Sequence, residues 1–134
     1  MIAVEDVIER AGPEGVLPLL SLAEFFAGNT VEDSLAPNQW GYGRPPLAEL
    51  AAGLARIADR PEVAWVRVQL HPETLDLAEL LAEAVAVCTS ADAASCESWA
   101  AGWESSGVVN GLVDEYLDVP PVPVGMAIRS IVWD

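Results

Sequence analysis

The segment Asn38-Gln-Trp-Gly-Tyr-Gly-Arg44 holds the residue types best suited to binding another molecule. Tryptophan, tyrosine and arginine are enriched at the energetic centres of interfaces, and glycines let a backbone turn and present them. We therefore predict that Trp40, Tyr42 and Arg44 contact a partner. The alternative is a loop folded back on its own domain with Trp40 over the core, because large aromatic side chains are usually buried. The segment lacks the glycine pattern and the Lys-Ser/Thr pair of a phosphate-binding loop.

Acidic residues occur in adjacent pairs, of which Glu32-Asp33 lies closest to this segment. Paired carboxylates can hold a metal ion or share a proton. No pair has the spacing of a calcium loop, and one histidine cannot supply a typical zinc site, so we predict neither metal nor cofactor. We expect Glu32 and Asp33 to meet a basic partner instead. The other acids that could join them in a negative patch are Glu73, Asp76, Glu79, Glu83, Asp114, Glu115 and Asp118.

Material for standard catalysis is scarce, and we predict no catalytic residue. His71 is the only histidine; it precedes Pro72 at a predicted strand end, where a turn or capping role is common, and no Gly-x-Ser-x-Gly motif accompanies it. Cys88 and Cys96 lack the spacing of a redox or zinc motif and have no cation beside them in sequence. We expect both to be inert thiols.

The charge balance limits the choice of partner. The chain has 21 acidic residues against 6 basic ones, all arginines, and a formal net charge of −15. Nucleic-acid backbones and anionic membranes require clustered cations, so both are excluded as partners. The same charge would raise the encounter rate with a basic protein, although solubility alone also explains acidity in many proteins, halophilic ones included.

Length and composition predict one folded domain over residues 1–134, since 52% of the residues are hydrophobic. The first residues carry acid where a secretory signal needs base, and no apolar run approaches the roughly 20 residues of a membrane span. We expect a cytoplasmic protein, either a monomer or a homodimer.

Periodicity along the chain predicts the elements that position these residues. We expect helices over 2–11, 21–26, 47–57 and 93–103, strands over 16–20, 63–70, 84–89 and 125–133, a loop over 28–46, and an extended connector over 119–124. Cys96, Trp99 and Trp103 would share one helix face against the sheet. Residues 105–117 stay ambiguous. The order predicts an α+β fold in which helices cover one face of an antiparallel sheet, as in the ferredoxin-like split βαβ order, with an extra N-terminal helix.

Several segments carry a family resemblance: Glu24-Phe-Phe-Ala-Gly-Asn29 followed by Ser34, Gly43-Arg-Pro-Pro46, Ala58-Asp-Arg-Pro-Glu-Val63 and Trp133-Asp134. In these the chain resembles small acidic bacterial proteins, some of them similar to immunity proteins encoded beside polymorphic toxins. The resemblance implies an inhibitor that covers a basic toxin, and it assigns no functional residue. We expect such a binding protein, with a small-ligand or regulatory module on a ferredoxin-like sheet as the alternative; neither is an enzyme.

Overall fold

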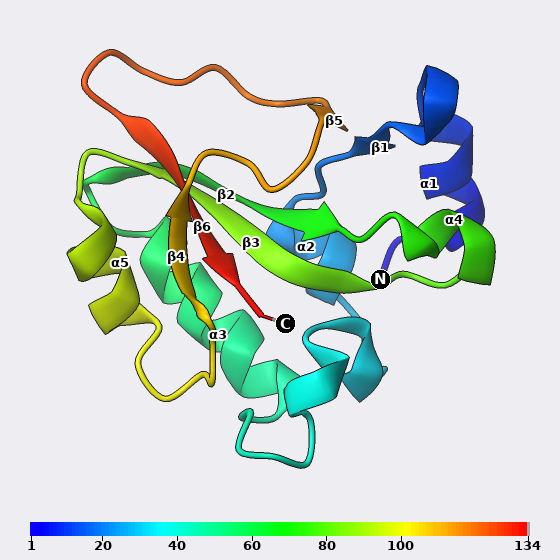
Figure 1. The fold of residues 1–134 in the computed structure, drawn as a ribbon, viewed down its shortest axis with the longest axis horizontal. Coiled ribbons are helices and arrows are strands. Elements are labelled where there is room, and N and C mark those ends of the chain that lie inside the picture. The colour runs from blue at the N-terminus through cyan, green and yellow to red at the C-terminus, as the bar shows by residue number, and fades with distance from the viewer. Residues whose placement is uncertain (134) are drawn as a thin grey trace.

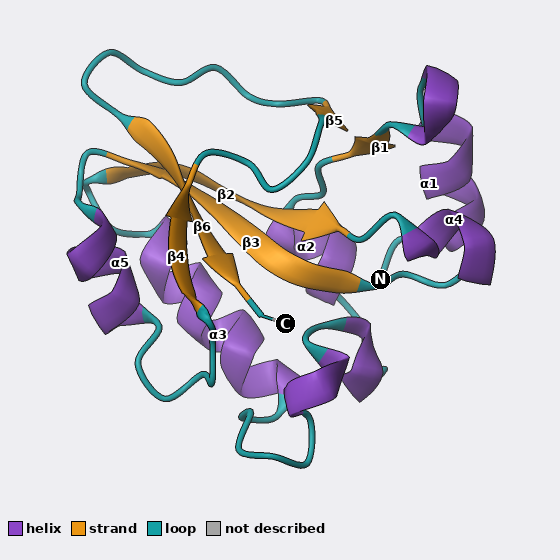
Figure 2. Ribbon diagram, in the orientation of Figure 1, coloured by secondary structure: helices purple, strands orange, loops and turns teal. Residues whose placement is uncertain are grey.

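The computed structural model describes residues 1–133 as an α+β fold (Figures 1 and 2). Its main sheet has the strand order β2-β3-β6-β4, with every neighbouring pair antiparallel. The strands are β1 Leu17–Pro18, β2 Val63–Leu70, β3 Ala82–Thr89, β4 Gly107–Asn110, β5 Tyr116–Leu117 and β6 Ala127–Val132. The helices are α1 Val4–Arg10, α2 Leu22–Phe26, α3 Leu47–Ala58, α4 Glu73–Leu77 and α5 Ala93–Trp99, with 3-10 turns η1 Pro13–Gly15, η2 Glu32–Ser34 and η3 Pro37–Gln39. Asp134, which the resemblance includes, lies outside the described residues.

The α+β class and the antiparallel sheet are confirmed, whereas the ferredoxin-like order is not. In a split βαβ order, two strands joined by a helix lie in one antiparallel sheet with another strand between them. Here the first predicted strand is not part of the four-stranded sheet, whose order is β2-β3-β6-β4. The segment predicted as a strand over 16–20 pairs instead with β5 through β1, and reaches β2 only by a bridge between Leu20 and Val68.

One face of the sheet packs against α3 and forms the main core. Helix α3 follows Pro45-Pro46 and has buried residues at helical spacing, and the alternation of β2 turns every second side chain toward it. Gly53 in α3 allows close packing, because an added Cβ would lie 2.3 Å from the Trp103 ring. The core residues contributed by α3 and β2 are Leu47, Leu50, Leu54, Ile57, Val63, Val66, Val68 and Leu70.

Residues 111–126, which we call the strap, cross the opposite face of the sheet. In Figure 1 this orange segment arches from β4 past β5 to β6. It covers a smaller apolar cluster made of Trp65, Ala86 and Cys88, to which Leu112, Met126 and Ile128 are added. Trp65 Nε1 also donates a 3.0 Å hydrogen bond to the Pro121 carbonyl. The strap therefore takes the place that a second layer of helices would occupy.

Helix α5 is shorter than predicted. It begins after the N-cap Asp92, whose side chain accepts from the Ser95 amide at 2.8 Å, and it ends at Trp99. Trp103 therefore lies beyond the helix, after Gly102 at φ +83°. The prediction that Cys96, Trp99 and Trp103 share one helix face is wrong for Trp103. Trp103 is still buried, because it packs on α3 instead.

Candidate functional site

The loop over residues 38–44, which we call the aromatic loop, presents Tyr42 to solvent and leaves Trp40 partly exposed. Tyr42 is 82% exposed and Trp40 is 37% exposed. Gly41 and Gly43 adopt φ of +90° and +107°, values that only glycine reaches without strain, and these two residues make the turn that presents Tyr42. Trp40 is mostly covered and packs against the buried Arg44, as the alternative expects, whereas Tyr42 is left on the surface.

The buried side chain of Arg44 fixes the conformation of this loop. Its Nη1 donates to the carbonyls of Glu32 at 2.5 Å and Leu35 at 2.6 Å, and its Nη2 lies 3.0 Å from Glu32 Oε1. Its guanidinium also stacks 4.4 Å from the centre of the Trp40 ring. Burial lowers the pKa of Arg44 and the nearby acids oppose that shift, so the group stays charged. Arg44 shapes the loop, and its guanidinium is not available to a partner.

The turn η2 separates the two acids that were predicted to act together. Glu32 Oε1 accepts from Arg44 and also from the Leu47 amide at 3.0 Å, so this carboxylate fastens the aromatic loop to the start of α3. Asp33 is exposed and lines a different surface. Of the two acids, only Asp33 is an exposed residue.

That surface is a pocket of about 310 Å³, which we call the apolar pocket. Four segments build it: the N-terminal residues, η2 with its preceding residue, the end of α4 and the residues just before β3. Val31 is 50% exposed and Leu77 is 53% exposed at its rim. Its lining residues are Met1, Ile2, Val4, Val31, Asp33, Ser34, Leu77, Glu79, Leu80 and Leu81.

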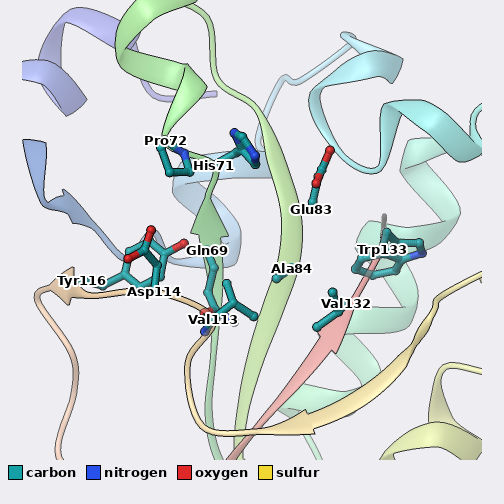
Figure 3. Close-up of a pocket in the computed structure, with 10 residues that line it drawn as sticks. All are labelled: Gln69, His71, Pro72, Glu83, Ala84, Val113, Asp114, Tyr116, Val132 and Trp133. Carbon is teal, nitrogen blue, oxygen red and sulfur yellow. Dashed lines mark hydrogen bonds between the residues drawn. The ribbon is translucent and has the colours of Figure 1, made fainter.

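A second pocket of about 310 Å³, the His71 pocket, lies between the strap and the ends of β2, β3 and β6 (Figure 3). It brings His71 together with two acids from the predicted patch, Glu83 and Asp114. Asp33 and Glu79 of the same set line the apolar pocket instead, so these four acids divide between two places. The other lining residues are Gln69, Pro72, Ala84, Val113, Tyr116, Val132 and Trp133.

Several polar atoms around the His71 pocket bond to other parts of the chain. Gln69 donates to Ser130 Oγ at 2.8 Å and accepts from the Val113 amide at 2.9 Å. Tyr116 donates its hydroxyl proton to the Leu70 carbonyl at 2.7 Å, and burial raises its pKa. His71 Nδ1 accepts from the Glu73 amide at 3.1 Å, which is the turn role expected of it. These groups fasten the strap and α4 to the sheet.

The thiols and acids of the described residues form no recognisable reactive centre. Cys88 and Cys96 are buried and unbonded to each other, and burial raises the pKa of both thiols. Within residues 1–133, no group of three His, Cys, Asp or Glu side chains is arranged to hold a metal ion. None of the helices in that range is long and apolar enough to cross a bilayer.

Comparison with known proteins places the chain in a family. A family model described as "Uncharacterized protein YfbO family" matches residues 2–131. The chain belongs to the YfbO family. No curated protein and no solved structure matches it. The region matched by the YfbO family model includes the whole aromatic loop, the strap and nearly all of the residues that line both pockets.

The apolar pocket was not predicted from the sequence. Its members come from segments far apart in the chain, but a local signal was present. Val31 and Asp33 are two residues apart, and so are Leu77 and Glu79, which places an exposed apolar residue beside an exposed acid in each segment. An apolar residue in an otherwise polar turn is the feature that could have indicated a contact surface.

Proposed function

We propose that this protein binds a basic protein partner in the cytoplasm and inhibits it by covering its surface, as an immunity protein does. The observation that carries the proposal is the aromatic loop. Tyr42 is 82% exposed, yet the loop beneath it is fixed by the buried Arg44. A side chain presented on a pre-organised loop loses little conformational freedom on binding, which is how tyrosine acts at interface centres.

The charge of the chain supports the choice of partner. A molecule with a formal net charge of −15 attracts a basic surface over several ångströms and repels nucleic acid and anionic lipid. The immunity-type role rests on the resemblance to small acidic bacterial proteins found beside toxins. The mechanism would be steric and electrostatic, with Tyr42 and Trp40 as central contacts and the surrounding acids speeding association.

The test is co-purification of the tagged protein with the products of the genes next to its own, followed by affinity measurement at increasing salt concentration. We expect a complex with a basic protein whose affinity falls as salt rises. Tyr42→Ala should weaken it by about tenfold or more. Val124→Ala, a fully exposed residue of the strap, is the matched control and should change little. Absence of a complex with every neighbouring product would contradict the proposal.

The alternative is a small-ligand or regulatory module, and the His71 pocket is the observation in its favour. Its volume lies at the lower end of the range for ligand sites. Glu83 and Asp114 line it together with His71, so a small organic cation is the ligand chemistry that suits it. A thermal-shift screen of amines against carboxylates and phosphates tests this, because a ligand that binds only the native state raises the melting temperature. Stabilisation by amines alone would favour this function.

A further inference from the structure

The apolar pocket brings together several large hydrophobic side chains that remain exposed to solvent. Met1, Val31 and Leu77 are three of the large hydrophobic residues that remain exposed, and all three line this one pocket. The rest of its apolar wall is formed by Ile2, Val4, Leu80 and Leu81. Exposed apolar residues gathered in a concave site mark a contact surface more often than the same residues scattered singly.

Carboxylates border this apolar surface from two sides. Asp33 lies on η2 and Glu79 follows α4, and both are exposed. No lysine, arginine or histidine is among the described residues that line the pocket. An occupant must therefore present an apolar group and, next to it, positive charge. A leucine-type or aromatic side chain flanked by lysine or arginine has this chemistry, and the long aliphatic stems of those cations also suit an apolar rim.

Charge also decides between kinds of occupant. A second copy of this chain would bring another 21 acidic residues against the same acidic rim, so self-association here is opposed by repulsion. Anionic lipid is repelled for the same reason. A basic polypeptide is the remaining occupant whose charge complements the site.

The turn η2 links the pocket to the base of the aromatic loop. Glu32 of this turn is bound to Arg44 of the loop, and Asp33 of the same turn lines the pocket. A partner that contacts both Tyr42 and the pocket would lie across η2.

We propose that the apolar pocket receives an apolar anchor side chain of the basic partner, while lysine or arginine residues flanking that anchor pair with Asp33 and Glu79. The inference rests on the proposed function and specifies the recognition sequence: a short basic segment containing one large apolar residue. Tyr42 would contact a neighbouring part of the same partner.

The experiment selects random 12-residue peptides displayed on phage against the immobilised full-length protein. We expect the enriched peptides to share a large apolar residue beside lysine or arginine. The affinity of the best synthetic peptide is then measured by fluorescence anisotropy. Leu77→Ser and Val31→Ser should each weaken it by about tenfold, and Asp33→Asn and Glu79→Gln by about two- to fivefold, since exposed ion pairs are screened.

Matched controls and a second measurement make the result decisive. Val109→Ser, at a residue 46% exposed on β4, and Glu97→Gln on α5 remove the same kinds of side chain elsewhere and should change little. Amide chemical shifts of the wild-type protein with the peptide should move at residues 31–34 and 77–81, which locates the site without any variant. Enriched peptides that are acidic or lack an apolar residue would overturn the inference.

The variants also separate failure of this inference from failure of the proposed function. If Tyr42→Ala weakens the peptide or the partner while Leu77→Ser and Val31→Ser do not, binding through the aromatic loop stands and the pocket inference is wrong. If none of the three variants matters, both are wrong. Loss of affinity in Leu77→Ser and Val31→Ser, with the controls unchanged, supports the pocket as the anchor site.

Discussion

The apolar pocket and the His71 pocket have the same volume, about 310 Å³, but they differ in the state of the side chains that line them. In the His71 pocket, Gln69 and Tyr116 bond to neighbouring parts of the chain, and His71 Nδ1 accepts from the Glu73 amide. In the apolar pocket, Val31 and Leu77 are each at least half exposed. The first pocket has polar groups that stabilise the fold, whereas the second has apolar groups whose burial would be favourable.

This difference indicates at which surface a partner would gain more binding free energy. Polar groups that already have partners gain little from a ligand that replaces them, because each hydrogen bond formed exchanges for one that existed. Apolar surface removed from water contributes about 25 cal/mol per Å². We therefore propose the apolar pocket and the aromatic loop, rather than the His71 pocket, as the surface for partner recognition, since the polar residues of the His71 pocket hold the strap.

The largest expected effect concerns the support beneath the aromatic loop. Arg44→Ala removes donors from the carbonyls of Glu32 and Leu35 and leaves the Glu32 carboxylate without its cation. The Glu32 side chain is 31% exposed, so the larger cost is that the two carbonyls lose their donors, and we expect the free energy of unfolding to fall by about 3 kcal/mol. Urea denaturation measures this, and partner binding should be lost as well.

Arg60→Ala is the matched control for that substitution. Arg60 also stacks on a tryptophan, with its guanidinium 4.2 Å from the Trp99 ring, but its side chain is 40% exposed. We expect a loss of about 1 kcal/mol or less, because exposed contacts of this kind are weak. Equal losses for the two variants would contradict the structural role given to Arg44.

The next effect concerns the strap over the His71 pocket. Gln69→Leu leaves the Val113 amide without its acceptor and removes the bond to Ser130 Oγ, which itself donates to the Gly111 carbonyl at 2.6 Å. We expect the free energy of unfolding to fall by about 2 kcal/mol. Hydrogen exchange should also quicken at residues 111–113.

Arg67→Leu provides the comparison on the same strand and the same face of the sheet. Its Nη1 donates to the carbonyl of the adjacent Val66 and its guanidinium lies 6.0 Å from the centre of the Trp65 ring, so the variant removes a local hydrogen bond and a weak ring contact. Exchange in the strap should stay at its wild-type rate. A strap that remains equally protected in Gln69→Leu would show that the His71 pocket is not built as we describe.

The smallest effect concerns the N-terminal wall of the apolar pocket. Ile2 is held there by a 2.6 Å bond from its amide to the Glu24 carbonyl, and Glu24 forms a capping box with Ser21 and a 2.8 Å ion pair with Arg10. Partial burial would raise the pKa of Glu24, but the Ser21 amide and the Arg10 guanidinium outweigh it and hold that pKa below its usual value.

A lowered folded-state pKa stabilises the protein above the unfolded value of about 4.3 and ceases to do so as the pH falls through the folded value. Glu24→Gln should therefore cost less than about 1 kcal/mol at pH 7, because about a third of each side chain is exposed and screened. The difference between the wild type and this variant should be smaller at about pH 3 than at pH 7. Urea denaturation at both pH values measures it, and a difference that grows on acidification would contradict the sign.

The elements with strong local signals were predictable from the sequence. Strand β2 matches its predicted bounds, because a β-branched and aromatic run lies between Pro61 and the pair His71-Pro72. Helix α3 follows from Pro46 and its apolar spacing, and the capping box at Ser21 opens α2 as expected. Each of these depends on neighbours within a few positions, which a sequence displays directly.

The remaining features depend on contacts between distant segments. Strands β4 and β5 pair with β6 and β1, and neither segment has a run long enough to predict a strand alone. Arg44 is buried because carbonyls 9 and 12 residues upstream face it, which no local pattern reveals. Tyr42 and Asp33 were predicted as surface residues and are exposed, but the apolar pocket beside Asp33 exists only once four segments meet.

The most direct test of partner recognition is a binding footprint on the intact protein. Amide chemical shifts are followed while the peptide enriched by selection is titrated into the full-length chain. We predict shifts at Val31, Asp33, Tyr42, Leu77 and Glu79, with the His71 pocket unchanged. Shifts confined to Gln69, Val113 and Tyr116 would place binding in the polar pocket and contradict the account.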